Sequence, residues 1–155
     1  MQKKPLGKIY VVDPSPLNWL FILFHTMEEL VAPDHEGYIT PSLASHFEWI
    51  DETTLEVSLR QDVVFHNGER FTAVSVARSF SEEQRWFSPH PTGTWMNLPR
   101  ETTLEIIDDY TVRFLFPLPE GLALGKLRAI HLGNELFWEK LGFGYWKQAS
   151  GEGRW

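Results

Sequence analysis

The chain has 155 residues, a formal charge of −7 and an isoelectric point near 5.3, and it contains no cysteine. An acidic surface repels phosphate backbones, which disfavours direct binding to nucleic acid. The missing cysteines exclude disulfides, thiolate metal sites and cysteine nucleophiles. The length and the ordinary apolar content predict a globular unit with a core of its own.

The start of the chain gives no sign of a leader. A short basic segment follows Met1, but no apolar stretch comes after it, so a signal peptide is not predicted. The apolar run over residues 19–24 is far shorter than the roughly 20 residues that span a bilayer. Two possibilities stay open: a cytosolic protein, or an exported protein whose leader lies outside this chain.

The first forty residues predict a strand, a helix and a turn. Residues 8–13 favour a buried strand, because residues 9–12 are apolar and rich in β-branched side chains. Asn18 is placed to cap a helix that runs through Leu30 and Val31. Glu28 and Glu29 at the far end of this helix oppose its dipole, so packing must hold it. A turn is expected over residues 32–37.

The next segment predicts two strands and a longer helix. Residues 46–50 read as a strand, and residues 54–60 alternate between apolar and polar, as in a half-buried strand. Asn67-Gly68 is a tight-turn pair. Thr72 caps a helix that ends near residue 86. Its core-facing side chains are expected to be Val74, Val76, Ala77 and Phe80.

The last third predicts a loop, a hairpin and short helices. Residues 87–100 form a loop rich in proline, glycine and aromatic side chains. Residues 103–107 and 110–116 form a hairpin around Asp108-Asp109, with one face shared by Val112, Phe114 and Phe116. Short helices are expected over residues 121–129 and 135–141. Residues 142–155 have no periodicity, and the sequence reads as cut short at Trp155.

One series of motifs resembles the family 5 extracellular solute-binding proteins, the peptide- and nickel-binding components of ABC importers. The motifs stand in the family's order over about forty residues: Pro41-Ser-Leu-Ala44, Trp49, Thr54-Leu-Glu-Val-Ser-Leu-Arg60, Val64-Phe-His-Asn-Gly68, Phe71-Thr-Ala73 and Ser79-Phe80. Weaker matches extend the resemblance over nearly the whole chain: Pro16-Leu-Asn18, Glu29-Leu-Val31, Asp108 to Phe114, and Gly151 to Trp155, where Glu152 and Arg154 depart from the pattern.

The resemblance implies an α/β, β-rich fold: part of lobe I of a type II periplasmic-binding-protein fold, with a mixed sheet, β-hairpins and packed helices. Residues 1–155 would be a truncated N-terminal lobe of a larger two-lobe protein. Within it, residues 1–40 begin the lobe core, residues 41–150 form a β-rich subdomain, and residues 151–155 begin the next strand segment.

The implied function is capture of peptides, nickel chelates or oligosaccharides between two lobes, and delivery to a membrane permease from the periplasm or cell exterior. Neither an enzyme nor a cofactor is expected, because no metal-ligand spacing, nucleophile elbow or phosphate loop is present. The protein would be peripheral to the membrane. The alternative is a cytosolic ligand-sensing domain of a transcription regulator built on the same module.

Five residues are candidates for contact with a ligand. By the resemblance, Trp95, in the aromatic loop with His90, sends its ring into the cleft, and Arg128 faces an anionic chelator. Asn18 and Trp19 follow the first strand and could line the cleft. Each has a structural alternative: Trp95 packed under its own loop, Trp19 in the core, and Arg128 as a surface residue at a helix end. His66 is expected to be part of a turn, because a lone histidine lacks partners at metal spacing.

Overall fold

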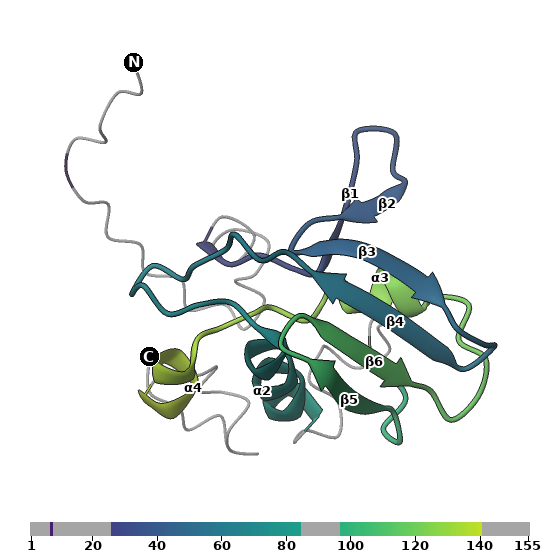
Figure 1. The fold of residues 1–155 in the computed structure, drawn as a ribbon. Coiled ribbons are helices and arrows are strands. Elements are labelled where there is room, and N and C mark those ends of the chain that lie inside the picture. Colours follow the sequence, from purple (N-terminus) through teal and green to yellow (C-terminus); the bar gives the residue numbers. More distant parts are fainter. Residues whose placement is uncertain (1–6, 8–25, 85–96, 141–155) are drawn as a thin grey trace, which may run out of the picture.

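A computed structural model describes residue 7 and the two stretches 26–84 and 97–140 (Figure 1). The expected strand at residues 8–13, most of the aromatic loop and the segment after residue 140 lie outside these stretches. The described elements are, in chain order, β1 (Val31–Pro33), β2 (Ile39–Pro41), β3 (Ala44–Trp49), β4 (Thr54–Leu59), α2 (Ala73–Gln84), β5 (Thr103–Asp108), β6 (Thr111–Leu115), α3 (Ala123–Leu127) and α4 (Glu135–Lys140).

Four strands form a sheet in the order β3-β4-β6-β5, and every described pairing is antiparallel. The alternation predicted for residues 54–60 is confirmed, since Leu55, Val57 and Leu59 are buried and the residues between them are only partly so. On β6, Val112 and Phe114 face the same core. This inward face of the sheet is therefore fixed by a period of two in both central strands.

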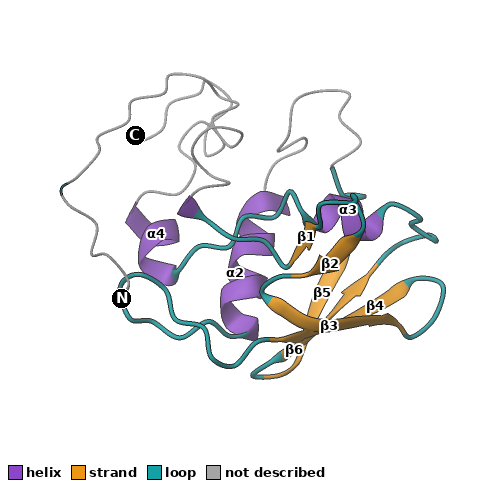
Figure 2. Ribbon diagram, turned by 90° about the horizontal axis from the view of Figure 1, so that it is seen from above, coloured by secondary structure: helices purple, strands orange, loops and turns teal. Residues whose placement is uncertain are grey.

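The core lies between this face and the helices. Phe80 of α2 meets Phe114 of β6 edge to face, with ring centroids 5.6 Å apart, and Leu127 of α3 is fully buried in the same cluster. Figure 2 shows α2 and α3 beside the sheet. No helix in the described stretches has the length and apolar content that crossing a bilayer requires.

A small hairpin, β1–β2, stands out from the body (Figure 1). It corrects the helix expected to run through Val31: Val31 pairs with Pro41 in the hairpin, and of residues 26–31 only Thr26 is helical. The carbonyl of Leu30 accepts hydrogen bonds from two amides, those of Ser42 and Ala44. These bonds satisfy the carbonyl of Leu30, which in a helix would have accepted from an amide four residues later. The turn is shorter than expected, because Ala32 and Pro33 belong to β1.

The prediction for the face of α2 was wrong at one position. Val74 is 62% exposed, whereas Ala73, Val76 and Phe80 are buried. Residues three and four apart, as Ala73, Val76 and Phe80 are, share one face of a helix. Val74 lies about 100° from Ala73 around the helix axis and so points elsewhere. The second buried face of the helix carries Ser75, Ser79, Glu82 and Glu83.

Candidate ligand-binding site

Of the five predicted ligand-contacting residues, the structure places one. Asn18, Trp19, His90 and Trp95 lie outside the described residues. Arg128 follows α3 directly and caps its carboxyl end. The described part of the candidate site is therefore the surroundings of Arg128.

The guanidinium of Arg128 lies beside a buried carboxylate. Its Nε is 3.9 Å from Oε2 of Glu29, and the side chains of Arg128 and Glu29 are 31% and 7% exposed. The distance allows charge attraction but exceeds that of a hydrogen bond. Arg128 is thus neither wholly in solvent nor locked in a close ion pair.

Glu29 was not singled out from the sequence, and its environment is unusual for a carboxylate. Burial raises the pKa of Glu29 to about 7, and the positive charge of Arg128 opposes this rise. A charge removed from water is costly unless it is paired and hydrogen-bonded. In the sequence, the only sign of this burial is that Glu29 directly precedes the apolar pair Leu30-Val31. That sign does not tell which of the two adjacent residues, Glu28 or Glu29, is buried.

Backbone hydrogen bonds fix the position of Glu29. Its carbonyl accepts from the amide of Leu43 at 3.1 Å, and the carbonyl of Glu28 accepts from the amide of Leu132 at 3.2 Å. The segment before β1 is thereby joined to the start of β3 and to the segment that follows Arg128. Glu29 and Arg128, ninety-nine residues apart in the sequence, are held side by side as a result.

The hydroxyl of Ser79 anchors the segment after Arg128 to α2. Ser79 Oγ donates to the carbonyl of Ser75 at 2.8 Å and accepts from the amide of Gly133 at 3.1 Å and from Nε1 of Trp138 at 3.0 Å. All of these bonds are buried. Gly133 is needed here, because an added Cβ would lie 2.7 Å from the ring of Phe137.

Replacing Ser79→Ala should lower the free energy of unfolding by about 2 kcal/mol, since it leaves the buried amide of Gly133 without an acceptor. Chemical denaturation measures the change. The matched control is Ser81→Ala on the exposed side of the same helix, for which we expect a change within about 0.5 kcal/mol. Equal effects of the two variants would show that the Ser79 hydroxyl does not hold this segment.

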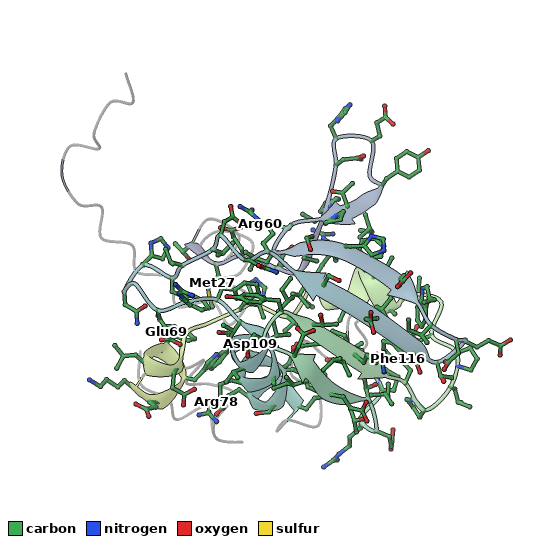
Figure 3. The ribbon with its side chains drawn as sticks, viewed as in Figure 1. Met27, Arg60, Glu69, Arg78, Asp109 and Phe116 are labelled. Carbon is green, nitrogen blue, oxygen red and sulfur yellow. The ribbon has the colours of Figure 1, made fainter. Side chains whose placement is uncertain are left out.

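Polar contacts also tie α4 to the body. Oε1 of Glu69 accepts from the amide of Glu135 at 3.3 Å, and Nε of Arg78 lies 3.6 Å from Oε2 of Glu135. Figure 3 shows Glu69 and Arg78 close to this helix. Arg78 also pairs with the buried Glu82 at 3.0 Å. These contacts have a structural role.

The turn that contains His66 is built as predicted. The amide of Gly68 donates to the carbonyl of Phe65 at 2.8 Å, and Gly68 has a φ of 89°, which glycine adopts without strain. His66 is exposed beside it. Within residues 26–84 and 97–140, no three His, Asp or Glu side chains gather as metal ligands would.

Two open hollows among the described residues are not lined by Arg128. One, of about 640 Å³, is lined by the β5–β6 turn with Asp108 and Asp109 and by the ends of β3 and β4. Another, of about 440 Å³, lies between α2 and β5. Neither is lined by Arg128 or Glu29, so these described residues alone do not enclose a ligand around the guanidinium.

Solved structures share this arrangement of sheet and helices. NikA from Brucella suis, in complex with Fe(III)-EDTA, is 27% identical with a TM-score of 0.64, over 73% of this chain and 23% of that one. An ABC transporter substrate-binding protein from Sinorhizobium meliloti is 25% identical with a TM-score of 0.60, over 83% and 25%. The periplasmic protein DppA from Helicobacter pylori, in complex with a peptide, shares the fold at 21% identity and a TM-score of 0.62, over 83% and 28%.

These likenesses define the class: the fold is that of part of a lobe of a periplasmic binding protein. The model of the bacterial extracellular solute-binding proteins, family 5, matches residues 38–149, and the chain belongs to this family. It spans about a quarter of the length of the solved relatives. No curated protein matches it. The family is a substrate-binding class and not a catalytic one.

Proposed function

We propose that this chain forms part of the first lobe of the solute-binding component of an ABC importer. The match of residues 38–149 to the family carries the proposal. The complete protein would capture a peptide or a related small solute, such as a nickel chelate or an oligosaccharide, and deliver it to a membrane permease. Similar proteins have been crystallised with a nonapeptide, with mannohexaose and with nickel–histidine.

Affinity in such a protein would come from closure of two lobes over the solute, without covalent chemistry. The open hollows among the described residues support this, because a second surface is needed to bury a ligand. Residues 1–40 would belong to the lobe core and residues 41–150 to its β-rich subdomain, with residues 151–155 leading into the next strand. The family's description as extracellular favours the periplasm or cell exterior over a cytosolic sensor.

In this proposal Arg128 binds a carboxylate of the solute, because a guanidinium can donate two parallel hydrogen bonds to it. Its partial exposure supports this role. Asn18 and Trp19 would line the cleft near the first strand. The loop with His90 and Trp95 would supply an aromatic wall.

Titration calorimetry tests the proposal. The complete protein that contains this chain is titrated with short peptides, nickel–histidine and an oligosaccharide, and the 155-residue chain is titrated in parallel. We expect the complete protein to bind one of these classes and the chain alone to bind it far more weakly, because half of the cleft is missing. Equally tight binding by the chain alone would contradict the proposal.

A further inference from the structure

The guanidinium of Arg128 is held on one side only. Its Nε is buried, lies near Glu29 and has no hydrogen-bond partner. The two terminal nitrogens are not among the buried unpartnered atoms, and no described residue accepts a hydrogen bond from them. The Arg128 side chain as a whole is 31% exposed. The terminal nitrogens therefore have a donor capacity that no described residue uses.

This arrangement differs from an ordinary structural ion pair. A buried carboxylate and an arginine that serve only to stabilise each other form close hydrogen bonds, often two in parallel at about 2.7–2.9 Å. Arg113 and Glu56 on the sheet do so through one bond of 2.7 Å. Oε2 of Glu29 instead lies 3.9 Å from Nε of Arg128, so it attracts the guanidinium without accepting a hydrogen bond from it.

Neighbouring basic side chains are already engaged. Nζ of Lys126 lies 2.6 Å from Oε2 of Glu120, and Arg60 forms two hydrogen bonds with Asp62. The other charged or titratable side chains on the segments packed around Glu29 are Glu28, which is exposed, and His131, which is buried with Nδ1 3.1 Å from the carbonyl of Ala129. Among these described groups, Arg128 is the cation without a hydrogen-bonded partner.

We propose that Glu29 is the positioning residue of Arg128: it attracts the guanidinium from its Nε side, so that the terminal edge is presented to a carboxylate of an anionic solute. The nature of the solute rests on the proposed function, whereas the positioning of Arg128 rests on the described contacts. Glu29 is suited to the task because its carbonyl accepts from the amide of Leu43, just before β3, and the carbonyl of Glu28 accepts from the amide of Leu132. A carboxylate fixed in this way lowers the number of side-chain conformations open to Arg128, so less entropy is lost on binding.

Nuclear magnetic resonance of arginine side chains tests the positioning directly. In the 155-residue chain, the Nε–Hε signal of Arg128 should shift with a midpoint near pH 7, where Glu29 ionises. In Glu29→Gln the pH-dependent shift should vanish and the heteronuclear NOE of the Nε–Hε group should fall, because the attraction between the carboxylate and the guanidinium is lost. Glu29→Asp, which keeps the charge, should restore part of both.

The signal of Arg60 is the internal control, because its partner is Asp62 and it should not respond to Glu29→Gln. Amide spectra of the variants verify that the fold is intact. The positioning is overturned if the Arg128 signal is the same in the wild type and in Glu29→Gln at every pH. A titration of the Arg128 signal that persists unchanged in Glu29→Gln would equally overturn the positioning.

A binding measurement tests the solute half separately. The complete protein is titrated with a tripeptide and with its carboxyl-terminal amide, and the ratio of the two affinities is compared between wild type and Glu29→Gln. We expect a preference for the free carboxylate that falls at least about threefold in the variant, equivalent to roughly 0.7 kcal/mol. If the protein binds peptides without preferring the carboxylate, the solute half fails while the positioning and the proposed function stand. If it binds none of the solute classes, the proposed function fails instead.

Discussion

The variant Phe114→Ala is expected to lower the free energy of unfolding by about 3–5 kcal/mol, a large share of the stability of a domain of this size. Phe114 is fully buried on β6, at the centre of the core, and stacks edge to face on Phe80 of α2. Truncation removes apolar contacts with the helix and leaves a cavity between it and the sheet, which can close only in part.

Urea or guanidinium denaturation followed by tryptophan fluorescence measures this loss. The matched control is Leu118→Ala, which removes a side chain that is 72% exposed just after the same strand. We expect that change to stay within about 0.5 kcal/mol. A loss for Phe114→Ala no greater than that of the control would mean that α2 does not pack on the sheet as described.

The second large effect concerns Glu29 and pH. Its pKa rises from 4.5 in the unfolded chain to about 7 in the folded one, mainly through burial. The folded state therefore binds the proton more tightly. The stability from this group is fully present below about pH 4.5 and is lost as the pH rises through 7, at a total of about 3 kcal/mol.

The measurement is the free energy of unfolding of the wild type and of Glu29→Gln between pH 4.5 and 8. The variant cannot ionise at this position, so the difference between wild type and variant should fall by about 3 kcal/mol over that range. Glu52→Gln, at an exposed turn, should leave the pH dependence of the wild type almost unchanged. If the free energies of unfolding of the wild type and of Glu29→Gln differ by the same amount at every pH, Glu29 is not buried in the folded chain.

Much of the fold could be predicted because local patterns decide it. The alternation in residues 54–60 and the shared face of Val112 and Phe114 follow from the period of a strand, and the structure confirms both. The Asp108-Asp109 turn is also as predicted, with Oδ1 of Asp108 accepting from the amide of Tyr110. Such elements carry their signal within a few residues.

The errors and omissions depend on partners far away in the sequence. Val31 reads as the end of an apolar helix, but its partner in the hairpin is Pro41. Ser79 gave no sign of its role, because the groups that it binds lie more than fifty residues later. The position of Glu29 likewise depends on distant partners, since its segment is hydrogen-bonded to Leu43 and Leu132. Tertiary contacts of this kind leave no periodicity from which they could be predicted.

Asn18, Trp19, His90 and Trp95 stay predictions, since the described residues do not include them. Arg128 lies directly after α3, beside the buried Glu29 and with a side chain that is 31% exposed. Its contact with a ligand also stays a prediction, and so does the alternative of a surface arginine at a helix end.

The central claim is that this chain supplies part of one lobe of a protein that closes over its solute. Small-angle X-ray scattering of the complete protein, with and without a saturating solute identified by calorimetry, tests it most directly. We predict that the radius of gyration decreases on binding, because the two lobes approach each other. Tight binding with an unchanged radius of gyration would contradict the account.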